Sequence, residues 1–287
     1  MDSMATHASA FATTCAALRS DSSPGYASMI RANGSQFIHI PKCGGSTIES
    51  FSKIGFQGHR ELYLGGPWGR VFLPMTRALR ADLITVFRHP VERLLSQYYF
   101  ELYAGPKTYS GAAKAQHLLC SRGTGVAEHN ITCRPKVSFL AYGMDESYRN
   151  NRGYDNLQFW YVRPARNSTV GEVRHFLASH FALIGVTERM LEFQVLLAHL
   201  FGIAAARVTA TVANARSRKG SARQQTARDV LNESEYRLLE ERNALDVQLH
   251  TWAANRFAHF AHCYGVTRLE TQVREALRRP SETRTYA

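Results

Sequence analysis

Residues 36–51 read QFIHIPKCGGSTIESF. The first five residues of this segment form a short β-prone run, which Pro41 ends and the pair Gly44-Gly45 follows. From Ser46 onward, apolar residues recur at the spacing of a helix, with Ile48 as the first of them. The segment therefore predicts a strand, a tight loop and a helix, in that order.

Two further units of the same kind follow along the chain. Residues 83–87, LITVF, are a continuous apolar run of the type found in strands buried on both faces. Pro90 follows it after two residues, and Val91 begins a helical repeat of apolar residues. Residues 181–186, FALIGV, predict a third strand, and residues 188–201 predict a helix after it.

The C-terminal part of the chain is predicted to be helical. Asn232 and Glu235 have the spacing of a capping box. A single long amphipathic helix is indicated by Leu238, Leu245, Leu249, Trp252 and Phe260. Strands that alternate with helices favour an α/β protein, which we expect to be a P-loop-like three-layer fold with a central, mostly parallel sheet. The predicted domain spans residues 34–265, between a flexible N-terminal tail (1–33) and a C-terminal tail (266–287).

The loop after the first predicted strand is suited to binding a phosphate. Its glycines let the backbone approach an anion closely, and the start of the helix offers unpaired N–H groups and a favourable dipole. Lys42 adds a cation before both glycines, an order that differs from a Walker A loop and argues against an ordinary ATPase. The alternative is a plain Gly-Gly turn with a serine helix cap. The candidate binding residues are Pro41, Lys42, Cys43, Gly44, Gly45, Ser46 and Thr47.

The second unit adds Arg88 at the end of its strand and Ser96 about two turns into its helix. A guanidinium can form two hydrogen bonds to a phosphate, and a hydroxyl can complete its coordination. Arg93 fits a structural salt bridge better. Because ligands of parallel sheets bind beyond the carboxyl ends of the strands, we expect both loops to lie at one edge.

Composition limits the partners without identifying them. The formal net charge is +12 and the pI is near 9.7, so the partners are expected to be anionic. No segment approaches the roughly 18 apolar residues of a membrane-spanning helix. Residues 1–31 are too polar for a signal sequence and indicate a flexible tail, a weak transit peptide or the stub of a longer protein.

The five cysteines form no CxxC pair and no zinc-binding spacing, so no structural metal is expected. Cys120 and Cys133 flank a polar loop, where they form either a disulfide or two free thiols. Four N-x-S/T triplets are compatible with a secretory route; they begin at Asn33, Asn130, Asn167 and Asn232.

Two segments together resemble the nucleotide-binding motifs of the carbohydrate sulfotransferases. They are FIHIPKCGGSTIESF and ITVFRHPVERLLSQYYF. The similarity is to the group that contains the heparan sulfate 2-O- and 6-O-sulfotransferases. Residues 154–158, 183–188 and 240–246 also fit that family in order, whereas Phe159-Trp160-Tyr161 departs from it. The departure puts acceptor recognition in doubt.

The resemblance implies a co-substrate, 3′-phosphoadenosine 5′-phosphosulfate, and no catalytic metal. In the family, the first motif holds the 5′-phosphosulfate side, while an arginine and a serine of the second motif, here Arg88 and Ser96, hold the 3′-phosphate. Lys42 is expected to stabilise charge on the leaving phosphate. The late basic segment of the family, which closes over the donor, corresponds to Arg218, Lys219 and Gly220 within residues 213–227; a solvated loop is the alternative.

The family also uses a histidine between its two motifs as the base that takes the acceptor proton. His59 is the only histidine between Cys43 and Arg88 and is the candidate base, with Glu61 as the alternative.

The predicted activity is sulfuryl transfer to a hydroxyl, expected to be that of a carbohydrate; an anionic polysaccharide, a lipid-linked sugar and a small metabolite stay open as acceptors. The resemblance implies the Golgi lumen or membrane, reached through an anchor that is missing from this chain or atypical. Two other classes of protein fit the sequence less well. A basic nucleic-acid-binding protein fits the charge but lacks a recognition motif, and a small-acceptor kinase lacks the expected order of lysine and hydroxyl residues.

Overall fold

The computed structural model describes residues 35–45, 47–48, 82–103, 120–121, 126–127, 130–131, 134–145, 147, 155–201, 225–266 and 270–271. Several predicted features lie outside these residues. They are Ser46, His59, Glu61, Cys133, Arg218, Lys219 and Gly220, together with the N-terminal tail and most of the C-terminal tail.

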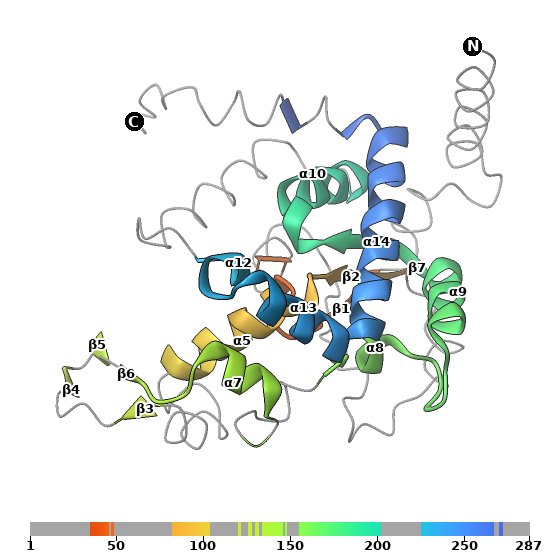
Figure 1. Cartoon of the computed structure of the whole chain (residues 1–287). Helices are drawn as coiled ribbons and strands as arrows, with labels where there is room; N and C mark the ends of the chain where they lie inside the picture. Colours follow the sequence, from red (N-terminus) through yellow and green to blue (C-terminus); the bar gives the residue numbers. More distant parts are fainter. Residues whose placement is uncertain are drawn as a thin grey trace, which may run out of the picture.

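A parallel sheet of three strands lies at the centre of the described structure (Figure 1). Its strands are β1 (Ser35–Ile38), β2 (Asp82–Phe87) and β7 (Phe181–Val186), in the order β1-β2-β7. Ile38 of β1 pairs with Thr85 of β2 in parallel register, and Phe87 pairs with Val186 of β7. The three strands agree with the prediction to within two residues, and the protein is a mixed α/β structure with a parallel sheet.

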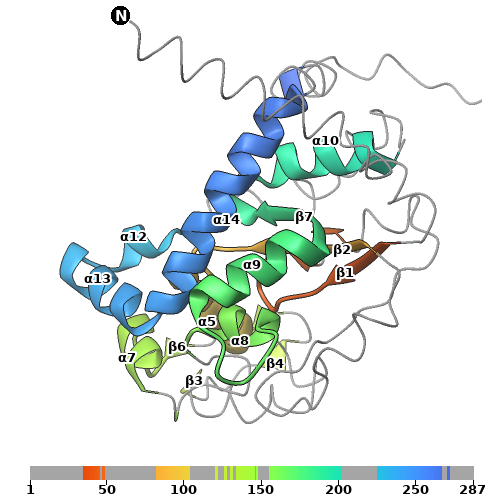
Figure 2. The same cartoon turned by 90° about the vertical axis from the view of Figure 1, so that its right-hand side faces the viewer.

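Helices surround this sheet (Figures 1 and 2). They are α5 (Pro90–Tyr103), α7 (Phe139–Met144), α8 (Leu157–Val162), α9 (Val170–His180), α10 (Met190–Phe201), α12 (Ala227–Val230), α13 (Glu233–Arg242) and α14 (Ala244–Cys263), with the 3-10 turn η2 (Thr187–Arg189) before α10. The helix predicted after Pro90 is α5, and the helix predicted after the third strand is η2 followed by α10. Gly45, Thr47 and Ile48 are also helical, as predicted after the first strand.

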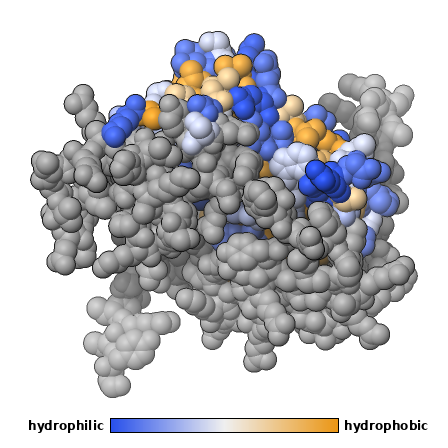
Figure 3. All heavy atoms as spheres, turned by 90° about the horizontal axis from the view of Figure 1, so that it is seen from below, coloured by the Kyte–Doolittle hydropathy of each residue, from blue (hydrophilic) through white to orange (hydrophobic). Residues whose placement is uncertain are grey.

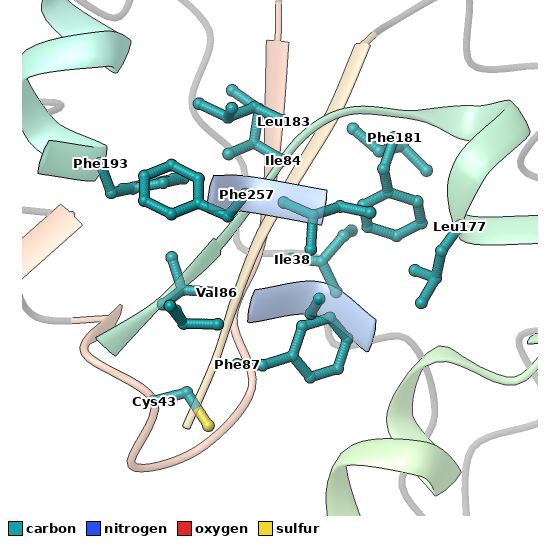
Figure 4. Packing of buried hydrophobic residues seen from close by; sticks show 14 of the residues in the cluster. Ile38, Cys43, Ile84, Val86, Phe87, Leu177, Phe181, Leu183, Phe193 and Phe257 are labelled. Atoms are coloured by element: carbon teal, nitrogen blue, oxygen red, sulfur yellow. The ribbon is translucent and has the colours of Figure 1, made fainter. Parts of the chain in front are cut away.

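The buried apolar residues form two clusters. One combines the sheet with side chains of α8, α9, α10 and α14, and Figure 4 shows Phe193 and Phe257 packed beside Leu183 and Ile84 of the strands. The other joins α5, α7 and α13 around Tyr98 and Leu239. All six residues of β7 are buried, which accounts for the unbroken apolar run that predicted this strand.

The single long C-terminal helix of the prediction is wrong, because the chain turns at Asn243 between α13 and α14. The Asn243 side chain donates to the Leu239 carbonyl, 2.8 Å away, and accepts from the Asn156 N–H at 3.0 Å. These bonds hold residue 243 outside helical geometry, with φ at −109° and ψ at 32°. The capping box of Asn232 and Glu235 is confirmed at the start of α13.

Four two-residue strands make two small antiparallel pairs away from the sheet (Figure 1). β3 (Cys120–Ser121) pairs with β6 (Arg134–Pro135), and β4 (Val126–Ala127) pairs with β5 (Asn130–Ile131). On the face shown in Figure 3, the coloured residues mix hydrophobic with hydrophilic side chains. Within the described part of the chain, no helix is long and apolar enough to cross a membrane.

Candidate functional site

The loops after β1 and β2 meet at one edge of the sheet, as predicted. The two strands are parallel neighbours, so their carboxyl ends lie together. The Thr85 hydroxyl donates to the Ile38 carbonyl at 3.0 Å, and Nη1 of Arg88 lies 3.4 Å from the Lys42 carbonyl oxygen. The second predicted motif is thus in direct contact with the first.

The loop after β1 is held in a tight conformation that depends on its glycines. Gly44 has a φ of +84°, and a Cβ built on it would lie 2.4 Å from Cε of Met190. A Cβ on Gly45 would lie 2.0 Å from Nε2 of His39. The N–H of Thr47 donates to the Gly44 carbonyl at 3.0 Å, which starts the helix directly after the loop. Glycine is therefore favoured at position 44 by its positive φ, whereas a side chain at position 45 would have to displace the His39 ring.

Lys42 directs its side chain toward helix α5. Its ammonium nitrogen lies 3.9 Å from the centre of the Phe100 ring, a cation–π contact. Ser96 lies four residues before Phe100 on the same helix, and residues at this spacing share one helix face. The lysine of the first motif and the serine of the second are therefore on the same side of α5.

Arg88 lies between the first loop and the start of α5. Its Nη2 is 3.9 Å from Oε2 of Glu92, so the carboxylate partly neutralises the guanidinium that was predicted to bind a phosphate. Oε1 of Glu92 also accepts from the N–H of Ala227 at 2.8 Å. Because the end of the basic segment is attached here, residues 225–227 lie beside the candidate site. The Tyr99 hydroxyl adds a second attachment, donating to Oε1 of Gln225 at 2.7 Å.

Two fully buried side chains, Gln158 and Asp246, hold both loops in place. Asp246 accepts from the backbone N–H groups of Gln158 and Phe159, at 3.1 and 2.7 Å. Burial raises the pKa of Asp246 to about 6, while the nearby charge of Arg93 opposes this rise. Arg93 is itself fully buried, and the salt bridge predicted for it stays a prediction. The Gln158 side chain reaches the Arg88 backbone and the Cys43 thiol.

Cys43 is buried and its thiol is a free one. Burial raises its pKa to about 12, so the thiol stays protonated and acts as a hydrogen-bond donor. In Figure 4 Cys43 lies on the loop below Val86 and Phe87, within the packed interior. Its role is therefore to hold the loop, and it is not exposed for nucleophilic chemistry.

His89 points away from the first loop and fixes the second unit to the C-terminal helices. Its Nε2 is 3.1 Å from Oε1 of Glu240, and its Nδ1 is 3.0 Å from the Tyr236 hydroxyl. Because a carboxylate only accepts, Nε2 carries the proton and Nδ1 accepts from the tyrosine. Burial and the charge of His250 lower the pKa of His89 to about 4. The backbone N–H of His89 donates to Glu188 at 2.8 Å.

The structure thus brings together the first loop, Arg88 and the helix that carries Ser96. Sequence reasoning assigned no role to four residues that complete this arrangement, which are Glu92, Phe100, Gln158 and Asp246. The sequence offered two signals for them: Asp246 lies within an apolar helical stretch, and Gln158 lies beside apolar residues. Among the residues that the structure describes, no group of three or more His, Cys, Asp or Glu side chains is arranged to hold a metal ion.

No protein-family model, no curated protein and no solved structure matches this chain. The local geometry and the two sequence motifs therefore carry the functional interpretation.

Proposed function

We propose that this protein is a sulfotransferase that moves a sulfuryl group from 3′-phosphoadenosine 5′-phosphosulfate to a hydroxyl of an acceptor, expected to be a carbohydrate. The observation that carries the proposal is the contact between the two motif loops, with Nη1 of Arg88 3.4 Å from the Lys42 carbonyl. Two cations and a tight glycine loop at one edge of a parallel sheet fit a ligand with two anionic groups. The resemblance of the same two motifs to the carbohydrate sulfotransferases supplies the identity of that ligand, and with it a P-loop-like fold.

The residues have separate proposed tasks. The backbone at Gly44 and Gly45, with Lys42, would bind the 5′-phosphosulfate side, and Arg88 with Ser96 would bind the 3′-phosphate. Glu92 lies 3.9 Å from Arg88, so a phosphate would have to compete with its carboxylate. On the pattern of the family, we also propose hydrogen-bond donors to the nucleotide from Ser46 and from Arg218 to Gly220 of the basic segment.

The proposed reaction is an in-line displacement at sulfur. The acceptor oxygen forms a new S–O bond as the bond from sulfur to the 5′-phosphate oxygen breaks, and the released nucleotide takes the electron pair. The acceptor proton passes to His59. Lys42 would stabilise the charge that develops on the leaving oxygen, where a positioned cation acts most strongly.

The test has two parts. Wild-type protein should show a raised melting temperature with 3′-phosphoadenosine 5′-phosphate, because a ligand that binds only the folded state stabilises it. Arg88→Ala should lose most of this shift, while Arg237→Ala, an exposed arginine of α13, should keep it. Radiolabelled sulfate should pass from the donor to at least one member of a panel of polysaccharides and small alcohols.

Each outcome has a distinct meaning. An unchanged shift in Arg88→Ala would show that the second motif is misassigned. A rise in melting temperature with ATP and magnesium, but none with 3′-phosphoadenosine 5′-phosphate, would favour the kinase class instead.

A further inference from the structure

The side chain of Gln158 forms a paired hydrogen bond with the backbone of Arg88. The Arg88 N–H donates to Oε1 of Gln158 at 2.9 Å, and Nε2 of Gln158 donates to the Arg88 carbonyl at 2.7 Å. The backbone N–H and carbonyl of Arg88 are therefore both bonded to the side-chain amide of Gln158. This arrangement fixes the backbone directly after β2, at the point from which the Arg88 guanidinium extends.

The same amide oxygen also contacts the other loop. Sγ of Cys43 donates to Oε1 of Gln158 at 3.2 Å. Cys43 lies one residue after Lys42 and one before Gly44, in the centre of the first motif. A single side chain from helix α8 thus connects the two loops that would bind the two phosphate groups.

Gln158 is itself held in place. It is fully buried, its backbone N–H donates to Oδ2 of Asp246 at 3.1 Å, and its Nε2 is 3.5 Å from the same oxygen. Asp246 belongs to α14, which packs against β7. The position of Gln158 is therefore set by the packed interior, and both loops are bonded to its side chain.

We propose that Gln158 is a positioning residue that fixes the distance between the two anion-binding loops and thereby makes the site selective for a ligand with two separated phosphate groups. This inference rests on the proposed function. It deepens that function by assigning selectivity for the 3′-phosphate to a residue that would not touch the nucleotide.

The proposal predicts a change in selectivity rather than a uniform loss of binding. Adenosine 5′-phosphate needs only the first loop, whereas 3′-phosphoadenosine 5′-phosphate needs both loops at the correct spacing. The decisive quantity is therefore the Kd for adenosine 5′-phosphate divided by the Kd for the 3′,5′-bisphosphate. A general loss of stability lowers both affinities together and leaves this ratio unchanged.

The variant is Gln158→Met, which keeps the length of the side chain and removes its hydrogen bonds. The matched control is Gln194→Met on α10, because Gln194 is also buried and its Nε2 has no hydrogen bond within the described part of the structure.

Both Kd values are measured by isothermal titration calorimetry at pH 8 for each protein. The ratio should fall about tenfold in Gln158→Met, which corresponds to about 1.4 kcal/mol of lost interaction with the 3′-phosphate. It should stay within about twofold of wild type in Gln194→Met.

A ratio unchanged in folded Gln158→Met would overturn the positioning role while leaving the proposed function intact. Wild-type protein that binds neither nucleotide would instead overturn the proposed function, and the selectivity with it.

Discussion

Lys42 has a backbone φ of 67°, in the left-handed region that residues with a side chain seldom adopt. A lysine in this conformation costs some conformational energy, which favours a role for its ammonium group. The 3.9 Å contact with the Phe100 ring shows where that group lies.

We therefore predict that Lys42→Ala lowers kcat by about 10²-fold or more, the usual effect of removing one donor to developing charge. Binding of 3′-phosphoadenosine 5′-phosphate should weaken far less, because the lysine acts mainly in the transition state. Steady-state sulfate transfer and calorimetry measure the two quantities. Equal losses in both would make Lys42 a simple anchor for the ligand.

His59 is the proposed base and lies outside the described residues. His59→Ala should reduce turnover by about 10²- to 10⁴-fold and leave donor binding nearly intact. His59→Asn should be almost as inactive, since it supplies no base. If His59→Ala kept more than about a tenth of wild-type turnover at saturating substrates, the assignment would move to Glu61.

His89 makes stability depend on pH in a defined direction. Its pKa is lowered from 6.5 in the unfolded chain to about 4 in the fold, so the folded state binds this proton less readily. The stability that neutral His89 contributes is complete above pH 6.5 and is lost as pH falls toward 4. The loss in the free energy of unfolding is on the order of 3 kcal/mol, since each unit of pKa shift corresponds to roughly 1.4 kcal/mol.

The measurement compares wild type with His89→Gln by urea unfolding at several pH values. Wild type should lose its advantage over the variant between pH 6.5 and 4. Comparing the two proteins cancels the opposite contribution of Asp246, whose raised pKa favours the fold at low pH. A constant difference between the two proteins over this interval would show that His89 does not titrate as described.

At the scale of elements, helices α8 and α14 cap each other. Oδ1 of Asn156, which precedes α8, accepts from the N–H groups of Leu245 and Asp246 at 2.9 and 3.1 Å. Asp246 in turn accepts from Gln158 and Phe159 in the first turn of α8. Each helix thus satisfies the N-terminal donors that the other leaves unpaired.

Asn156→Ala should consequently cost about 2 kcal/mol in the free energy of unfolding, at the upper end for a helix cap, because alanine also tolerates the φ of 53° poorly. Asn232→Ala removes only the local cap of α13 and should cost about 1 kcal/mol. Urea midpoints of the two variants give the comparison. Equal costs would indicate that a cap between two helices stabilises the fold no more than a cap within one helix.

These long-range caps also explain what the sequence could and could not predict. The strands were recognisable because an apolar run or alternation is a local pattern, and the capping box of Asn232 is local too. The break at Asn243 was missed, because Leu238 and Leu245 continue a helical spacing across it. Leu238 is in fact 39% exposed. Bonds from Asn156, 87 positions earlier in the sequence, hold that turn, and no window of neighbouring residues contains them.

The same reasoning applies to the candidate site. That the loops of Gly44, Gly45, Lys42 and Arg88 lie together could be predicted, because loops after neighbouring parallel strands emerge at one edge of the sheet. The contribution of Gln158 depends on contacts with residues 43, 88 and 246, which come from three distant segments. Such a residue is visible only once the chain is folded.

At the scale of the whole molecule, 35 Lys and Arg against 23 Asp and Glu give a net charge of +12. We expect random-sequence duplex DNA to bind weakly, with an affinity that falls at least about tenfold between roughly 50 and 200 mM salt as counterions are released. The thermal shift with 3′-phosphoadenosine 5′-phosphate should persist at the higher salt. Fluorescence anisotropy measures the first quantity, and sequence-selective binding that resists salt would revive the nucleic-acid-binding class.

The link from Asp246 through Gln158 to the two loops has a consequence for synthesis on the ribosome. The chain emerges from its N-terminus, so residues 43 and 88 leave the ribosome long before residue 246. Until α14 has been made and has packed, Gln158 lacks the carboxylate that holds it, and the loops lack their common support. The first segments of the candidate site to be translated are therefore among the last to reach their final geometry, and a nascent chain that stops before α14 is not expected to bind the nucleotide.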